Sequence, residues 1–278
     1  MTAVVDAAAL VGAAGPTYVD RSTSVWPRPG EPGTYDGVVG ERWAGMRGVH
    51  GGMLAAMAVR AVEAEAPGRA VRTVSTSFLR PGTVGPIEAR VQVERSGRAV
   101  TTASVELHQV HRRVALVRVT ATGEVTSDDW DTAPPLDLPP LSECVPLNPP
   151  TGVRHFEHAE AVLDPADVPF SESAAARVGG WVRPREPSQR IGPAWLTMIM
   201  DWFPPSPFTR HAMPVGGVSV DYTVHLHTGA VALEGGDWLG ARFVSDRGAG
   251  GLALEHGRLH APDGSLVAES FHTRWTGS

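Results

Sequence analysis

The sequence predicts an α+β fold in which one long helix packs on an antiparallel sheet, and it predicts this arrangement twice. Three observations support the prediction: two apolar helical segments, a series of strand-like stretches after each, and a proline-rich segment between the two series. Each half has the order of one helix followed by four strands. We therefore expect two tandem halves of similar architecture within the 278 residues.

The clearest helix of the first half lies within residues 49–67. Apolar side chains recur there at helical spacing, charged side chains fall on the opposite face, and Pro67-Gly68 ends the segment. Strand-like stretches follow it, with turn signals such as Arg80-Pro81-Gly82 between them. They lie at residues 72–79, 87–94, 100–109 and 114–122.

Prolines crowd residues 128–150, which we interpret as an extended linker that cannot join a sheet. Two strand-like stretches then precede a second apolar helix at residues 192–203, and four more strands follow it. The strands lie at residues 156–162, 176–182, 217–227, 237–245, 253–260 and 265–275. We assign residues 1–126 to an N-terminal half, 127–152 to the linker and 153–278 to a C-terminal half.

The composition argues against several classes of protein. The chain has 24 Lys and Arg against 30 Asp and Glu, a net charge of −6, which disfavours nucleic-acid binding. Its one cysteine, Cys144, cannot form an internal disulfide, which suits a reducing compartment. No apolar run is long enough to span a membrane, and the first residues lack the basic segment of a signal peptide. We expect a cytoplasmic protein.

The motifs of several enzyme classes are missing from the sequence. It has no Gly-x-Ser-x-Gly elbow, Walker loop, Cys-x-x-Cys or His-Glu-x-x-His segment, which argues against a Ser-His-Asp hydrolase, a nucleotide site and a zinc site. His225 and His227 would share a face of a strand, but further ligands at fitting spacing are missing. We predict neither a metal ion nor an organic cofactor.

A long helix buried against a sheet, repeated twice across a linker, is the double-hotdog arrangement. The segments HGGMLAAM, TVSTSFLRPG and the turn RSGR resemble the first half of the acyl-CoA thioesterase II (TesB-like) family. The segments MIMDWF, VSVDYTVHLH and DGSLVAESFH resemble its second half. The resemblance implies a double-hotdog hydrolase of lipid metabolism that converts an acyl-CoA thioester to a free acid and coenzyme A.

Asp201 is the first candidate for a catalytic residue. Its carboxylate is nearly alone among apolar neighbours in AWLTMIMDWF, and burial would raise its pKa toward that of a usable base. From the pattern alone, a helix-end Asp that faces solvent is an equal alternative. The resemblance favours the catalytic interpretation, because the family's aspartate lies at this point of the second helix and orients or deprotonates the hydrolytic water.

Two glycines, Gly51 and Gly52, follow His50 at the start of the first helix, although glycine disfavours a helix by about 1 kcal/mol relative to alanine. A helix start offers free N–H groups and the positive end of the dipole, and glycine lets a ligand approach closely. The resemblance implies that the Gly52 N–H polarises the thioester carbonyl, with Gly51 and His50 beside the substrate. For the glycines, the alternatives are tight packing of the helix against the sheet or a turn that needs positive φ; for His50, they are capping or packing.

The resemblance places two more side chains beside Asp201. The family has a Thr or Ser on the strand after the second helix and a Gln on the last strand, and Ser219 and His272 occupy these positions. Both would hold the hydrolytic water. His272 departs from the family pattern, although a neutral histidine still forms hydrogen bonds and titrates near neutral pH; an ordinary strand residue is the alternative. Strand alternation would point Asp221 to the same side as Ser219.

An alignment of the two halves predicts one working site in each chain. An offset of 141 residues pairs Gly52 with Pro193 and Arg60 with Asp201. One site would combine the Gly52 N–H with the Asp201 carboxylate. A second site, made from Pro193 and Arg60, would lack both a donor and a base, because proline has no N–H and arginine is no base.

We expect the acyl chain of the substrate to lie between the two helices. The side chains expected to contact it are Met53, Met57, Trp195 and Met198. Acyl-CoA is the expected partner, and a carrier-protein thioester or a non-catalytic acyl-thioester binding protein on the same fold are the alternatives. The departure at His272 supports the non-catalytic alternative. A homo-oligomer is also compatible with the sequence.

Overall fold

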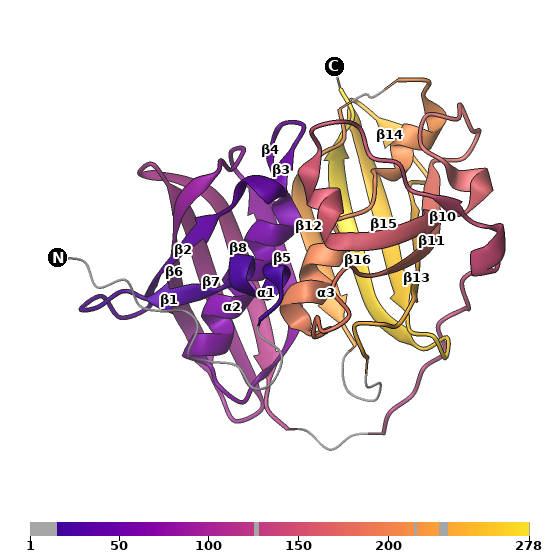
Figure 1. Ribbon diagram of the computed structural model, residues 1–278. Helices are drawn as coiled ribbons and strands as arrows, with labels where there is room; N and C mark the ends of the chain where they lie inside the picture. Colours follow the sequence, from indigo (N-terminus) through magenta and orange to yellow (C-terminus); the bar gives the residue numbers. More distant parts are fainter. Residues whose placement is uncertain (1–15, 125–127, 214–215, 228–232, 278) are drawn as a thin grey trace.

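The computed structural model describes residues 16–124, 128–213, 216–227 and 233–277. Within these residues, one long antiparallel sheet runs through both halves, and the two main helices lie side by side against it (Figure 1). Residues 1–15, where the sequence predicts no signal peptide, lie outside the described residues. In the part that is described, no helix is long and apolar enough to cross a membrane.

The first half contains the central helix α2 (Gly51–Glu65) and the strands that wrap around it. The elements before it are α1 (Tyr18–Thr23), β1 (Val25–Pro27), β2 (Thr34–Val39), the 3₁₀ helix η2 (Glu41–Trp43), β3 (Ala44–Gly45) and β4 (Gly48–Val49). The elements after it are β5 (Ala70–Phe78), β6 (Gly85–Ser96), β7 (Val100–Gln109) and β8 (Arg112–Thr122). The predicted helix and four strands are therefore present, whereas α1, β1 and β2 were not predicted.

The second half has a shorter central helix, α3 (Pro193–Ile199). It follows η3 (Leu141–Glu143), β9 (Val145–Pro146), η4 (Arg154–His158), β10 (Ala159–Leu163), η5 (Pro165–Asp167) and β11 (Arg177–Pro184). After it come η6 (Ser206–Arg210), β12 (Val218–Leu226), β13 (Leu239–Val244), β14 (Gly248–Ala249), β15 (Leu252–His260) and β16 (Leu266–Trp275). Pro204-Pro205 follow α3 closely, which agrees with the early end of this helix.

The strand order shows that the two halves are related by an approximate two-fold axis. It runs β1-β2-β6-β7-β8-β5-β12-β16-β15-β13-β11-β10-β9, so that β5 meets β12 at the centre, and β8 and β16 are their outer neighbours. The β5–β12 pair joins the halves through main-chain hydrogen bonds, from Ser77 opposite Asp221 to Thr73 opposite His225. The last strands of the two halves, β8 and β16, therefore lie on either side of the central β5–β12 pair, as expected for a double hotdog.

The core lies between the sheet and the helices. Nearly every side chain of α2 from Gly52 to Val62 is buried, so this helix is apolar on all sides and packs inside the wrap of β5 to β8. The helix α3 packs against α2 and contributes the buried side chains of Trp195, Leu196 and Met198 to the same hydrophobic cluster. One continuous core thus spans both halves.

The proline-rich segment is fastened to the second half, so the expectation that it cannot join a sheet is wrong. Val145 pairs with Leu163, and the Leu147 N–H donates to the Ala161 carbonyl at 3.1 Å. Proline is tolerated here because β9 is an edge strand, where a missing N–H breaks no ladder between two neighbours. The end of the linker is thereby fastened along β10.

We expect Leu196→Ala in α3 to lower the free energy of unfolding by about 2–5 kcal/mol, because Leu196 is fully buried where the two helices meet. Leu254→Ala is the matched control: Leu254 is 59% exposed on β15, and we expect a change within about 0.5 kcal/mol. Urea unfolding of both variants measures the difference. Equal destabilisation of the two variants would contradict a core centred on the helix pair.

Candidate active site

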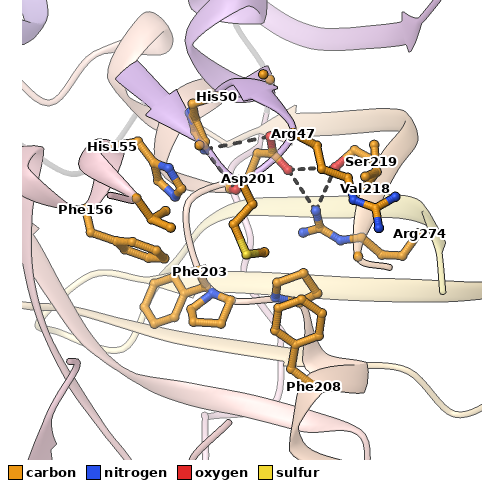
Figure 2. Close-up of a pocket in the computed structure, with 18 of the residues that line it drawn as sticks. Arg47, His50, His155, Phe156, Asp201, Phe203, Phe208, Val218, Ser219 and Arg274 are labelled. Atoms are coloured by element: carbon orange, nitrogen blue, oxygen red, sulfur yellow. Dashed lines mark hydrogen bonds and ion pairs between the residues drawn. The ribbon is translucent and has the colours of Figure 1, made fainter. Parts of the chain in front are cut away.

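The end of α3 meets the start of α2 at a cavity of about 590 Å³. Both halves line this cavity, and so does the end of the linker, at residues 146–150. Asp201, two residues after α3, faces into it, together with Ser219 from β12 and Arg274 from β16 (Figure 2). Three segments far apart in the sequence therefore supply the polar side chains of one site.

Hydrogen bonds hold the carboxylate of Asp201 on both oxygens. Its Oδ2 accepts the Gly52 N–H at 2.8 Å, and its Oδ1 accepts Ser219 Oγ and Arg274 Nη1, each at 3.0 Å (Figure 2). Arg274 Nη1 also donates to Ser219 Oγ at 2.7 Å. The structure thus brings together three of the predicted site residues, Asp201, Ser219 and Gly52, and adds Arg274.

Arg274 is the main residue of this site that the sequence interpretation missed. Its guanidinium lies between two buried carboxylates: Nε and Nη2 donate to Glu255 Oε1 at 3.0 and 2.7 Å, while Nη1 reaches Asp201. Glu255 on β15 also accepts the Ser206 N–H at 2.6 Å. An Arg and a Glu that fall on inward-facing strand positions were the available signal, because a buried charge needs a partner.

The pKa of Asp201 is lowered, so the expectation that burial would raise it is wrong. Burial does raise the pKa, and it is the largest single effect, but Arg274 outweighs it together with His50, His272 and the Ser219 hydroxyl. The pKa of Glu255 is lowered in the same way, with Arg274 as the main opposing charge and the hydrogen bond from His272 next. Both carboxylates are therefore ionised at neutral pH.

His272 lies behind the site and does not line the cavity. Its side chain is fully buried, its Nδ1 lies 3.1 Å from Glu255 Oε1, and it is 3.9 Å from Asp201 Oδ1. Because an ionised carboxylate only accepts, Nδ1 carries the proton. Burial lowers the pKa of His272, and Arg274 lowers it further, so the ring is neutral. The expectation that His272 holds the water directly is corrected: Arg274, two residues later on the same face of β16, reaches the carboxylate instead.

His50 caps α2 and also ties the two helix ends together. Its Nδ1 accepts the Met53 N–H at 3.2 Å, so the neutral ring donates from Nε2 to the Asp201 carbonyl at 3.0 Å. Burial lowers the pKa of His50. His155, which the sequence interpretation missed, stacks on it with ring centroids 4.6 Å apart, and burial lowers its pKa well below the usual value. Both rings line the cavity.

The two glycines allow the close approach of α2 to the end of α3. A Cβ on Gly52 would lie 2.7 Å from the Met198 carbonyl oxygen and 3.0 Å from Asp201 Cβ, and one on Gly51 would lie 2.7 Å from Phe78 Cζ. Tight packing is thus part of the reason for both glycines. The Gly52 N–H is occupied by Asp201, whereas the Gly51 N–H has no partner among the described residues. This corrects the expectation that the Gly52 N–H is free for a substrate carbonyl.

The four side chains expected to contact the acyl chain do not line the cavity. Met53, Met57, Trp195 and Met198 are buried in the core between the helices and the sheet. They point away from the cavity because packing of α2 on α3 fills the space between the helices. The apolar lining includes instead Phe156 and Phe208 of short 3₁₀ helices and Phe203 of a loop (Figure 2).

Asp221 also lies outside the cavity lining, although strand alternation would place it beside Ser219. The register of β12 against β16 shifts between Ser219 and Asp221. This bulge adds one residue, so Asp221 is exposed and Tyr222 turns inward, where its hydroxyl donates to the Thr197 carbonyl at 2.6 Å. Among the described residues, no cluster of three or more His, Cys, Asp or Glu could hold a metal ion.

The cavity has a cationic side and an apolar side. Arg47 and Arg80 line it and are exposed, and Arg47 has no hydrogen bond or ion pair to another residue that the structure describes. Figure 2 shows Arg47, Val218, Ser219 and Arg274 on one side of Asp201, and His155 and Phe156 on the other. The carboxylate therefore lies at the boundary between a region suited to anions and a region suited to an apolar chain.

Comparison with known families gives two matches that together span most of the chain. Residues 39–123 match the family described as the acyl-CoA thioesterase N-terminal domain, and residues 123–275 match the acyl-CoA thioesterase C-terminal domain. No curated protein matches the sequence.

Solved structures confirm the fold. A hot dog fold protein of unknown function from Alicyclobacillus acidocaldarius superposes with a TM-score of 0.84 at 19% identity, covering 94% of this chain and 98% of that one. A protein from Thermobifida fusca described by its similarity to thioesterase II gives a TM-score of 0.80 at 23% identity, covering 95% of this chain and 98% of that one. The acyl-CoA thioesterase II TesB2 of Mycobacterium marinum gives 0.73 at 21%, over 94% and 97%. The double-hotdog prediction is therefore confirmed.

We expect Gly52→Ala to lower both stability, by about 1–3 kcal/mol, and the activity of the site, because the new methyl group must push the Met198 carbonyl and Asp201 away. Gly236→Ala is the matched control, since a Cβ there meets nothing within 4 Å. Thermal unfolding and turnover of both variants provide the measurement. A Gly52→Ala protein of unchanged melting temperature would contradict the packing argument.

Proposed function

This chain belongs to the acyl-CoA thioesterase family and is a thioester hydrolase; from that premise, we propose that it hydrolyses an acyl-CoA by direct attack of water, with Asp201 as the group that orients and deprotonates the water. The observation that carries the proposal is the buried, ionised Asp201 carboxylate, which faces a cavity between a cationic and an apolar region. The sequence resemblance assigns the same role to this aspartate.

The carboxylate can bind one more hydrogen-bond donor. Its two oxygens offer about four acceptor sites, of which Gly52, Ser219 and Arg274 occupy three. A water molecule donating to the remaining site would be fixed in orientation, and Ser219 Oγ, which already donates to Asp201 and accepts from Arg274, has a second lone pair for it. Asp201 and Ser219 would thus hold the water, and Arg274 would hold Asp201.

The reaction would proceed without a covalent enzyme intermediate. The water oxygen attacks the thioester carbon while Asp201 accepts its proton, and the carbonyl π electrons move to the oxygen. Collapse of this tetrahedral species breaks the C–S bond, and the thiolate takes the proton from Asp201, giving the free acid and the thiol of coenzyme A. The lowered pKa makes Asp201 a weaker base but keeps it ionised, so positioning of the water carries more of the catalysis.

We assign polarisation of the thioester carbonyl to the Gly51 N–H in place of the Gly52 N–H. Gly51 lines the cavity, opens α2, and leaves its N–H without a partner among the described residues. The positive end of the helix dipole lies at the same point, where negative charge on the carbonyl oxygen would develop. The exposed Arg47 and Arg80 would meet the phosphates of coenzyme A.

We expect Asp201→Asn to reduce kcat by at least about a hundredfold, because the amide cannot accept a proton. Asp221→Asn is the matched control. Asp221 lies on β12, is exposed and does not line the cavity, so this variant should retain full activity. Release of free thiol from a panel of acyl-CoAs measures both. Equal rates for the two variants would remove Asp201 from the mechanism, and no release by the unmodified protein would redirect the proposal to carrier-protein thioesters.

We expect Arg274→Gln to move the acid limb of the pH profile of kcat/KM to higher pH. Activity requires ionised Asp201 and falls as the pH drops through its pKa. Arg274 helps to hold the pKa of Asp201 below the usual range, against the effect of burial, which raises it. When this cation is removed, burial is opposed less and the pKa of Asp201 rises. Arg258→Gln, which removes an Arg bound to Glu269 at 3.2 Å outside the cavity, should leave the limb unchanged. An unshifted limb in Arg274→Gln would contradict the proposed role.

A further inference from the structure

A second hollow, of about 630 Å³, lies behind the apolar side of the main cavity. Six residues line both spaces: Pro146, Leu147, Pro149, Pro150, Val153 and Phe156. Since each of these residues borders both spaces, the wall between the cavity and the second hollow is only one residue thick. The wall is made by the end of the linker and by η4, which lie outside the two repeated helix-and-sheet units.

We propose that Phe156, together with Leu147, which also borders both spaces, ends the acyl-binding part of the main cavity and thereby sets the length of acyl chain that the protein accepts. The proposal rests on the proposed function, in that the ligand is taken to be an acyl thioester whose carbonyl lies at Asp201. It adds a residue that determines substrate specificity to the residues of the reaction.

The direction of the acyl chain follows from the polarity of the cavity. The anionic phosphates of coenzyme A belong on the side of Arg47, so the acyl chain extends from Asp201 to the opposite side. Phe156 lies on that side in Figure 2. An apolar chain that leaves Asp201 in this direction therefore meets the wall at Phe156.

The ring of Phe156 is held in place by aromatic neighbours. It packs against His155 with ring centroids 4.2 Å apart and edge-on against Trp202 at 4.9 Å. The Trp202 Nε1–H donates to the His155 carbonyl at 3.0 Å, which fixes the neighbour on the far side of the wall. Phe156 itself carries no polar group, so truncating it opens the wall without leaving a buried donor or acceptor unpaired.

The second hollow has an apolar floor that an alkyl chain could occupy. Trp202 and Trp238 line it together with Ala161 and Val162 of β10, while charged side chains such as Arg185 are also part of its lining. The Trp238 ring is covered by the Arg183 guanidinium, 4.6 Å from its centre, so it is fixed in orientation. A chain released by removal of the wall would therefore find a preformed apolar surface.

The test compares chain-length dependence in the unmodified protein and in Phe156→Ala. Kd is measured for non-hydrolysable CoA thioethers with straight alkyl chains of increasing length, and kcat/KM for the corresponding acyl-CoAs. Each methylene buried in an apolar site tightens binding about fourfold. In the unmodified protein we expect this gain to stop at one chain length. In Phe156→Ala we expect it to continue over several further methylenes.

Two control variants distinguish a change in the limiting chain length, caused by removing the wall, from a general weakening of binding in the cavity. Phe208→Ala removes a Phe that lines the main cavity alone, and it should weaken binding without moving the limiting chain length. Trp238→Ala should leave the length dependence of the unmodified protein unchanged, but reduce the gain for long chains when combined with Phe156→Ala.

An unmodified protein without a limiting length would overturn the proposal, and so would the same limit in a folded Phe156→Ala variant. Binding with the expected limit but without turnover would contradict the proposed hydrolysis and leave the wall supported. Failure of the two proposals is therefore distinguishable.

Discussion

The burial of one carboxylate at the junction of two helix ends is the constraint on which the rest of this site depends. Asp201 follows α3, where the negative end of the helix dipole disfavours a negative charge. An isolated ionised carboxylate could not be buried there, because its desolvation costs far more than a typical domain's stability margin. The start of α2 supplies an N–H, and β16 supplies a cation, so the ionised form becomes the stable one.

Stabilising the buried Asp201 carboxylate in this way also requires particular residues that take no part in the reaction. The helix start can reach Asp201 only because Gly52 has no side chain, and Arg274 can be buried only because Glu255 balances it from β15. Buried ion pairs are costly to assemble and costly to break singly. The site is therefore a connected unit of helix ends and inward strand positions, joined by hydrogen bonds.

The approximate two-fold relation of the halves creates a second, pseudo-equivalent position, and the described residues form different contacts there. At the pseudo-equivalent position, Arg60 forms an ion pair with Asp20 at 2.7 Å, and Gln189 binds the same carboxylate at 3.2 Å. The helix α1, which carries Asp20, thus occupies the second position, and Pro193 offers no N–H there. Beside Asp201, the corresponding place is taken by the cavity, which the end of the linker also lines.

The sequence by itself determined the two helices and the eight strands that follow them, because apolar periodicity and turn residues are local signals. It also indicated Asp201, Ser219 and the two glycines, through a resemblance carried by short motifs. It missed β1, which is three residues long, and β2, which a glycine interrupts. Only the tertiary structure decided that Arg274 and not His272 reaches the carboxylate, that a bulge turns Asp221 outward, and that the end of the linker lines the cavity. These outcomes depend on strand register and on contacts between distant segments, which local patterns do not specify.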